Sequence, residues 1–324
     1  MPMVLFGGSP DSLFFLLIAL AVNGIFGGRW LSFLRPFHPE ALFGRLADWF
    51  DRRLNRTKRS ERNRILRGGL VVFVLGGLTF ALGVGCLDFA ASAAFGRSIE
   101  ILLLAVLIPL RPVFDEGRAL AGALKGERFS PAAFSFLAAS PKDDLHGYAR
   151  LGIENLAVRF GKDVVAPVFW FVLLGLPGVF LVRATRVLGQ RLGGGNARHM
   201  AFGFVPGRFD AVLCLIPVHL AGLFLVAAAI FTPRANPVRS FRVLKDDGGG
   251  AFDLHAGGPV AAMAGALDLA LGGPGPGKGG QQGVAWGGSG RARAGIVDIR
   301  QALYLFAVAA FLLFGLTAAL AIAV

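Results

Sequence analysis

Leu70 to Phe95 read LVVFVLGGLTFALGVGCLDFAASAAF, and Asp88 is the one formally charged side chain in this block. A helix needs roughly 20 apolar residues to cross the hydrocarbon core of a bilayer, which is about 30 Å thick. The alternation of apolar and polar residues that marks outer-membrane strands does not occur in the block. Because backbone groups in lipid must pair within their own segment, the block predicts a membrane-spanning α-helix.

Other apolar blocks lie on both sides of this one. Four are candidate crossings: Ser12–Phe26, Val164–Val182, Ala211–Phe231 and Ala302–Val324. Ile99–Leu110 is shorter, so it is either a crossing or a re-entrant or interfacial segment. We therefore predict an all-α polytopic membrane protein with five or six transmembrane helices, together with amphipathic helices in its loops.

The composition agrees with burial in lipid. Hydrophobic residues make up 55% of the chain and charged residues 16%, against about 25% charged in a soluble domain. Cys86 and Cys214 both lie in apolar blocks, which predicts buried thiols rather than a disulfide framework. The net charge of +13 comes from loops beside the apolar blocks. This placement indicates positive cytoplasmic loops and argues against a nucleic-acid-binding surface.

We predict one membrane domain over residues 1–324, with three connecting segments of different character. Residues 29–69 form a strongly basic loop, which the positive-inside rule places in the cytoplasm. Residues 111–162 carry mixed charge with helical spacing of their apolar positions, which predicts amphipathic helices. Residues 233–300 are polar and Gly-rich and are predicted to be loop. The N-terminus lacks the basic region of a signal peptide, so we expect the first span to be retained.

Several residues have both a structural and a functional interpretation. Pro167, Pro177 and Pro217 are expected to break their apolar blocks, either as simple kinks or beside a cavity. His219 is an ionisable group at membrane depth, and a hydrogen-bonded histidine of the core is the simpler explanation than a functional one. Gly272–Gly279 read GGPGPGKG, a phosphate-loop pattern that lacks its final Ser or Thr, so we expect contact with a simple anion at most.

Two pairs of charged residues stand near the ends of the apolar blocks. Arg150 and Glu154 are four residues apart on one predicted helix face, the spacing of a surface ion pair. Asp210 opens an apolar block just after Arg208, the position of an acid that complements a helix dipole. Neither pair alone indicates a reaction.

Four stretches along the chain together form a more specific pattern. They are His38-Pro39 with Gly44-Arg45, Arg150-x-x-x-Glu154 with Ala166-Pro167, Arg208-Phe209-Asp210 with Pro217, and HAGGPVAAMAGAL from His255 to Leu267 followed by Gly272-Gly273-Pro274. In order and spacing this pattern resembles the membrane-bound adenosylcobinamide-phosphate synthase (cobinamide synthase) family of cobalamin biosynthesis. The last stretch is the most specific, since it is similar to the family's N-A-G-W-P-E-A-A-M-A-G-A-L…L-G-G-P.

Many polar signature residues of that family are replaced here. The family's E-N-x-x-D corresponds to Val158-Arg159-x-x-Lys162, with Asp163 one position late. Ala211 stands at the second Asp of the family's R-x-D-D, and Val260 stands at the Glu of the last motif. The hydrophobic and glycine skeleton is retained while these polar groups are not.

The resemblance implies a ligase-type enzyme of the bacterial cytoplasmic (inner) membrane. The implied reaction is the ATP-dependent attachment of aminopropanol, or its phosphate, to adenosylcobyric acid, with ATP and Mg²⁺ as cofactors. It implies a corrinoid and a small aminoalcohol as substrates, and the lipid bilayer as surroundings. The implied catalytic residues are Arg150, Glu154, Arg208 and Asp210, in which the arginines contact anions and Glu154 or Asp210 serves as metal ligand or base. The positions expected near the nucleotide are Arg45, His255, Gly257, Gly272, Gly273 and Lys278.

Two other functions stay open at this point. The lost polar residues favour a catalytically lapsed membrane relative that acts as a sensor or regulator. The Pro-broken blocks are compatible with a small-molecule transporter, although no repeated half is visible in the sequence.

Overall fold

The computed structural model describes residues 10–27, 39–56, 59–93, 95–126, 145–193, 198–248, 257–273 and 286–323. Their regular structure is helical except for one small antiparallel sheet, in which β1 (Leu271–Gly272) pairs with β2 (Trp286–Gly287). The chain divides into two compact units where one domain was predicted. Unit 1 comprises Met1–Pro109, Ala166–Cys214 and Ala318–Val324, and unit 2 comprises Leu110–Val165 and Leu215–Thr317.

Within the described part of the chain, three helices are long and apolar enough to cross a membrane: α3 (Glu61–Ser92), α10 (Phe204–Phe231) and α13 (Ile296–Ala323). At about 1.5 Å per residue, each of them exceeds the roughly 30 Å of the hydrocarbon core. This confirms the all-α membrane class. The block Ile99–Leu110 becomes α4 (Gly96–Leu107), and a new helix, α5 (Leu110–Leu124), begins directly after it. A helix of 12 residues is only about 18 Å long, so α4 does not by itself reach across a bilayer.

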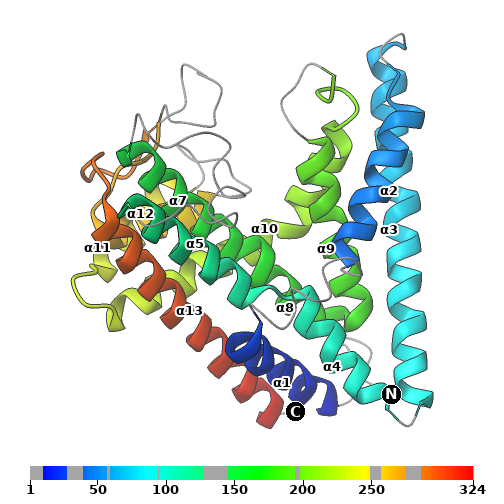
Figure 1. Cartoon of the computed structure of the whole chain (residues 1–324), viewed down its shortest axis with the longest axis horizontal. Helices are drawn as coiled ribbons and strands as arrows, with labels where there is room; N and C mark the ends of the chain where they lie inside the picture. Colours follow the sequence, from blue (N-terminus) through cyan, green and yellow to red (C-terminus); the bar gives the residue numbers. More distant parts are fainter. Residues whose placement is uncertain are drawn as a thin grey trace. The chain divides into compact units, whose positions relative to one another are not determined.

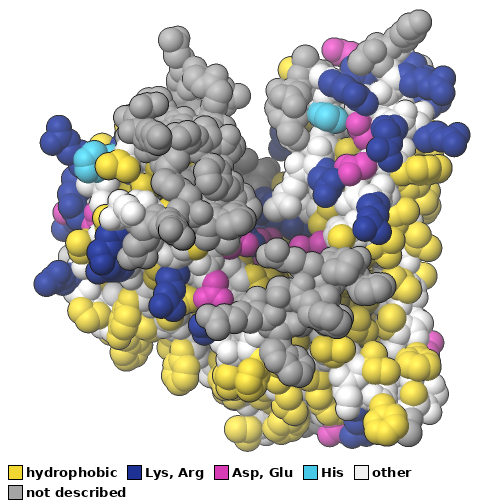
Figure 2. Space-filling view, in the orientation of Figure 1, with side chains coloured by type: hydrophobic (Ala, Val, Ile, Leu, Met, Phe, Trp, Pro, Cys, Tyr) yellow, Lys and Arg dark blue, Asp and Glu magenta, His cyan; other side chains and the backbone are white. Residues whose placement is uncertain are grey.

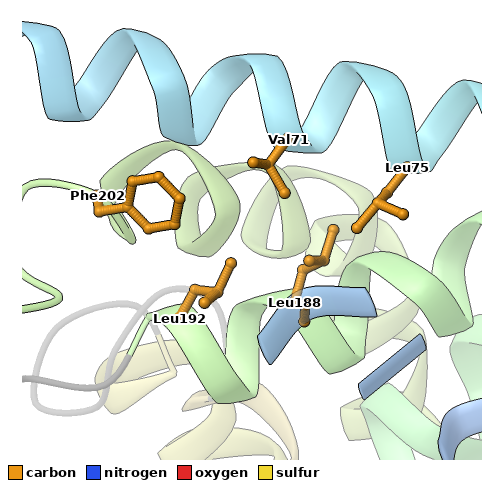
Figure 3. Packing of buried hydrophobic residues seen from close by; sticks show 6 residues of the cluster. Val71, Leu75, Leu188, Leu192 and Phe202 are labelled. Atoms are coloured by element: carbon orange, nitrogen blue, oxygen red, sulfur yellow. The ribbon is translucent and has the colours of Figure 1, made fainter. Parts of the chain in front are cut away.

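Unit 1 is built around the contact of α3 with α9 (Leu176–Leu192), beside which α2 (Pro39–Leu54) also packs (Figure 1). Val71 and Leu75 of α3 face Leu188 and Leu192 of α9, and Phe202 closes the cluster (Figure 3). All five side chains are buried. This unit also contains α1 (Pro10–Phe26), which packs on α4, α8 (Ala166–Leu174), the first part of α10 and the end of α13.

The block Val164–Val182 is not the continuous span that the sequence predicted. It consists of the end of the π-helix η2 (Phe160–Val165), then α8, and then the beginning of α9, with Gly175 between the two α-helices. Gly175 has a φ of 67°, which L-residues rarely adopt, and Pro177 follows within the first turn of α9. Gly175 and Pro177 together end one helix and begin the next, because glycine reaches this φ without strain and proline suits a helix start.

Pro217 lies inside α10, which continues through it, so the break expected at this proline does not occur. Proline lacks the N–H that would bond the carbonyl of Leu213 four residues earlier. The indole Nε1–H of Trp170 donates to this carbonyl oxygen at 2.9 Å. The helix therefore continues because a side chain from α8 satisfies the freed backbone group.

Unit 2 contains α5, α7 (Leu145–Arg159), η2, α11 (Pro237–Asp247), α12 (Gly257–Leu267) and most of α13. Every residue of α12 is buried, and most of them are Gly or Ala. A Cβ on Gly265 would lie 2.7 Å from the carbonyl oxygen of Arg239, so α11 and α12 are in backbone contact. The segment 233–300, which was predicted to be polar loop, thus includes two helices, one of which lies in the core of unit 2. Small side chains permit this burial because they let backbones approach closely.

His219 and Asp210 both differ from their structural interpretations. His219 is exposed on α10 rather than buried in the core, and its Nδ1 lies 2.7 Å from the carbonyl oxygen of Leu215. Asp210 does not begin a helix, since α10 starts at Phe204, and it is buried. The helix simply extends further toward its N-terminus than the apolar block does.

Candidate functional site

Arg150 and Glu154 of α7 both contact the region of the small β-sheet. The Oε1 atom of Glu154 accepts the backbone N–H of Gly272 at 2.7 Å. The guanidinium of Arg150 lies 4.9 Å from the centre of the Trp286 ring and donates to the carbonyl oxygen of Ala292 at 2.7 Å. The two side chains therefore connect one helix face to β1 and β2, which flank the Gly-rich stretch.

Gly272 and Gly273 have φ values of 82° and 66°, a region that favours glycine. A Cβ on Gly273 would collide with the Trp286 ring, so the absence of a side chain leaves room for the indole. Gly257, a third predicted nucleotide contact, is the first residue of α12 and is buried. His255 and Lys278 lie outside the described residues.

A second group of charges lies where α7 passes into η2, and we name it the α7–η2 cluster: Glu116, Arg159, Lys162 and Asp163. Arg159 Nε bonds Asp163 Oδ2 at 3.0 Å, and Arg159 Nη1 bonds Glu116 of α5. Lys162 and Asp163 are buried within η2 itself. π-helical turns are rare and frequently occur at functional sites.

The electrostatics of the α7–η2 cluster are balanced, with two basic and two acidic side chains in a largely apolar unit. Burial disfavours the charged form of Arg159, but the carboxylates of Asp163 and Glu116 outweigh this effect and raise its pKa. Arg159 is thus a permanent cation held from two sides. Phe160, the next residue, is fully buried and makes an edge contact with Phe306 of α13 at 5.2 Å between ring centres. The cluster is therefore adjacent to a packed pair of aromatic rings, Phe160 and Phe306.

Asp210 of α10 lies in unit 1 beside arginines of α9. Its Oδ2 atom is 3.6 Å from Arg186 Nη1, and its Oδ1 atom is 3.7 Å from Cys214 Sγ. One turn before Arg186 on α9, Arg183 is buried and forms an ion pair with Glu40 at the start of α2. Asp210 is therefore part of a buried set of opposite charges within unit 1.

Arg208 and Arg45 are exposed in the same unit. The guanidinium of Arg208 lies 5.6 Å from the ring centre of Phe204, its neighbour one helical turn earlier. Since residues two apart do not share a helix face, Arg208 points away from buried Asp210. The structure thus joins Arg150 and Glu154 at β1 and β2 in unit 2, while it separates Arg208 from Asp210 in unit 1.

The described residues contain no group of three His, Cys, Asp or Glu side chains that could hold a metal ion by themselves. Of the two predicted metal ligands, Asp210 is buried against Arg186, whereas Glu154 is only half-buried. Mg²⁺ commonly uses one or two carboxylates and takes its remaining ligands from water and substrate phosphates. Glu154 fits that requirement better than Asp210.

Sequence reasoning did not select the α7–η2 cluster or the arginines of α9 as site residues. One signal was available, since Arg159 and Asp163 are four residues apart next to an apolar block and stand beside replaced positions of the family motif. No comparable signal marked Arg186 or Glu116, because their partners are distant in sequence. Only the packing of helices brings those pairs together.

Comparison with known proteins agrees with the pattern of motifs. The family model described as CobD/Cbib protein matches residues 16–306. A protein of Sinorhizobium sp is 31% identical over 262 residues, which cover 79% of this chain and 81% of the relative. A protein of Brucella anthropi is 33% identical over 263 residues, covering 78% and 79%. Both relatives bear the name cobalamin biosynthesis protein CobD.

No solved structure matches the chain significantly. The family model nevertheless covers most of the sequence, including α7, η2 and the stretch of α12 that carried the resemblance. These matches and the relatives at about 30% identity over four fifths of their length leave one conclusion. The chain belongs to the CobD/Cbib protein family.

Proposed function

We propose that this chain acts in cobalamin biosynthesis and catalyses the ATP-dependent formation of an amide. The carboxylate of adenosylcobyric acid would be joined to aminopropanol or its phosphate, giving adenosylcobinamide or its phosphate. The observation that carries the proposal is the family match over residues 16–306, together with relatives named for cobalamin biosynthesis. The motif resemblance supports the specific reaction.

The chemistry of this reaction sets two requirements for a site. A carboxylate oxygen must first become a leaving group, and ATP supplies the phosphoryl group with which that oxygen departs as phosphate when the amine attacks. The site must neutralise negative charge on the phosphoryl oxygens, which basic side chains and Mg²⁺ do in phosphoryl transfer. It must also exclude water from the activated acyl group.

We assign Arg150 and Arg208 to the binding of anions, and Glu154 to a metal ligand or base, with Asp210 as the alternative. The contacts of Glu154 with Gly272 and of Arg150 with Trp286 support this assignment, since they hold both side chains beside β1 and β2. Preorganised charged groups are what such a site needs. The Gly-rich stretch between β1 and β2 includes Lys278, which we assign to the nucleotide phosphates with His255, Gly257, Gly272 and Gly273. Arg45 belongs to the other unit, and its assignment to the nucleotide rests on the motif resemblance alone.

We add the α7–η2 cluster to this proposal. Arg159, held by Glu116 and Asp163 at the end of the helix that carries Glu154, would fix the position of that segment. ATP and Mg²⁺ belong to the proposal on the family resemblance. Mg²⁺ would arrive with the nucleotide phosphates and take Glu154 as its protein ligand.

We further propose that the protein is a multi-pass protein of the bacterial cytoplasmic membrane. The apolar faces of α3, α10 and α13 support contact with the bilayer. The basic segment before α3 supports a cytoplasmic location for that end of the helix. Such an orientation would put Arg45 of α2, in the same unit as α3, on the side of the membrane where ATP is available.

Membranes that contain this chain provide the test. A strain that lacks its own cobinamide synthase would receive the wild-type gene or the Glu154→Gln variant, and growth that depends on cobalamin synthesis would be measured. In isolated membranes, conversion of adenosylcobyric acid with aminopropanol or its phosphate would be followed by chromatography, with and without ATP. Wild-type membranes should form the amide only with ATP. Full-length protein that neither restores growth nor forms the amide with either aminoalcohol would refute the proposed reaction.

A further inference from the structure

The junction of α2 and α3 carries arginines that face solvent without a carboxylate partner. Arg52, Arg53, Arg56 and Arg62 are exposed, and none of them forms an ion pair with another residue that the structure describes. Arg53 instead lies 5.5 Å from the ring centre of Trp49, which is itself 47% exposed. We name these four arginines and Trp49 the junction surface.

The acidic residues of α2 pair with residues outside the junction surface. Asp48 pairs with Arg191 of α9 at 2.5 Å, and Asp51 accepts from Arg198 at 3.1 Å and from His199 at 3.2 Å. Buried Arg64 binds the Asn55 side chain and the carbonyl oxygen of Arg198. The one exposed acid near the four arginines is Glu61. The junction surface is therefore strongly positive. The charged residues beside it, Asp48, Asp51 and Arg64, already have hydrogen-bond or ion-pair partners.

An apolar surface continues from these arginines along α3. Leu66, Leu70 and Phe73 are 63%, 53% and 81% exposed, at spacings that place them on one stripe of the helix. Arg62 stands one turn before Leu66 on the same stripe, about 6 Å along the axis. Figure 2 shows Lys and Arg side chains gathered over the end of α2 and the beginning of α3, with hydrophobic side chains covering the rest of α3.

The order of the arginines, Trp49 and the apolar stripe of α3 matches the order of layers in one leaflet of a bilayer. The exposed leucines and Phe73 suit the hydrocarbon core, and Trp49 suits the interfacial layer in which indoles are enriched. The guanidinium groups then lie at the level of the lipid headgroups. Arginine binds phosphate with two parallel N–H donors, and four uncompensated arginines favour a net negative headgroup over a zwitterionic one.

We infer that the junction surface, formed by Arg52, Arg53, Arg56 and Arg62 beside Trp49, binds the headgroups of anionic phospholipids. The four arginines and Trp49 are not among the residues to which the amide-forming reaction was assigned, of which Arg45 lies one helical turn before Trp49 on α2. Its occupant is a membrane lipid rather than a soluble anion, because the exposed apolar stripe adjoins the arginines and would accommodate acyl chains.

The test uses the full-length protein in detergent micelles. Bound lipid is counted by native mass spectrometry after addition of phosphatidylglycerol or, separately, phosphatidylcholine. One variant carries Arg52→Gln, Arg53→Gln, Arg56→Gln and Arg62→Gln. Its matched control removes the same charge from exposed, equally unpaired arginines of unit 2, through Arg118→Gln, Arg242→Gln, Arg293→Gln and Arg300→Gln.

Wild-type protein and the matched control should retain phosphatidylglycerol in preference to phosphatidylcholine. The junction variant should bind phosphatidylglycerol at least about ten-fold more weakly, since each basic residue near an anionic surface contributes on the order of five-fold. Equal losses in both variants, or a loss in neither, would overturn the inference. Displacement of the lipid by inorganic phosphate or by duplex DNA at matched charge concentration would also overturn it, because the surface would then be a general anion or nucleic-acid site.

Folding of the junction variant is checked by circular dichroism in the same detergent. If the four substitutions together unfold the protein, the pairs Arg52→Gln with Arg56→Gln and Arg53→Gln with Arg62→Gln replace it. Each pair should still bind phosphatidylglycerol more weakly than a matched pair from the control set. Unchanged binding in both pairs contradicts the inference.

Discussion

The indole N–H of Trp170 donates to the carbonyl oxygen of Leu213, at 2.9 Å. This carbonyl would otherwise be left without its intrahelical donor, because residue 217 is proline. A long apolar helix can therefore carry a proline without breaking, since a side chain of α8 replaces the missing backbone hydrogen bond. The cost of an unsatisfied carbonyl in an apolar setting explains why the contact matters.

Trp170→Phe should destabilise the protein, because it removes the donor while it retains an aromatic ring. The expected loss is about 1–2 kcal/mol, the typical range for a buried acceptor left without its partner. Thermal unfolding in detergent measures the loss. Trp49→Phe is the matched control, since Trp49 is exposed and its contacts with Arg53 and Phe50 use the ring rather than the indole N–H. Equal stability of the two variants would show that the Leu213 carbonyl finds another donor.

Gly83→Ala should destabilise unit 1 while Gly85→Ala should not. A Cβ at Gly83 would lie 2.5 Å from Pro177 Cα, whereas a Cβ at Gly85 meets nothing within 4 Å. Overpacking of this kind costs about 1–3 kcal/mol, and alanine on an open helix face stabilises by up to roughly 1 kcal/mol. Unfolding temperatures of the two variants provide the measurement. Opposite signs are expected, and a neutral Gly83→Ala would mean that α3 and α9 can separate without loss.

Arg159→Met should be far more costly than Arg111→Met, although both arginines pair with an Asp four residues later. Arg159 also binds Glu116, and its removal takes one cation away from both the buried Asp163 and the partly buried Glu116. We expect a loss of about 3 kcal/mol, the lower end for a broken buried pair because Arg159 remains a quarter exposed. The surface pair of Arg111 should contribute only a few tenths of a kcal/mol. Chemical denaturation in detergent distinguishes these values.

Glu154→Gln should abolish amide formation while it preserves the fold. The amide oxygen of Gln still accepts the N–H of Gly272, but the charge needed by a metal ligand or base is lost. We expect a loss of about 10²-fold or more in the rate of membranes that contain the variant. A purely positioning role predicts the opposite, namely near wild-type rates for Glu154→Gln and a loss only for Glu154→Ala. Measuring both variants separates the two roles.

Gly273→Ala should displace Trp286, whose ring occupies the space that a Cβ would need. The backbone φ of 66° adds strain of roughly 1–2 kcal/mol for a residue with a side chain. Gly126→Ala is the matched control, because Gly126 also has a positive φ of 89° but faces open space. A shift in tryptophan fluorescence is expected for Gly273→Ala alone. The same spectrum in both variants would show that the Trp286 ring does not depend on Gly273.

The class of this protein was predictable from composition and periodicity. Long apolar blocks such as Leu70–Phe95 leave no alternative to a helix in lipid, because every backbone group must find its partner within the segment. The motif from His255 to Leu267 likewise indicated the family, which the family model confirmed. These properties are local, so they can be read along the chain.

The remaining features depend on residues that are distant in sequence. Whether a proline breaks a helix depended on its surroundings: Pro217 is accommodated by Trp170, whereas Pro177 follows a break at Gly175. The partners of Arg159 and Asp210 come from other helices, Glu116 from α5 and Arg186 from α9. The segment 233–300 was predicted to be loop, and only the packed chain shows α11 and the buried α12 in backbone contact. Tertiary packing decides these points, because a charge or a freed carbonyl is satisfied by whichever donor the folded backbone brings within hydrogen-bond distance.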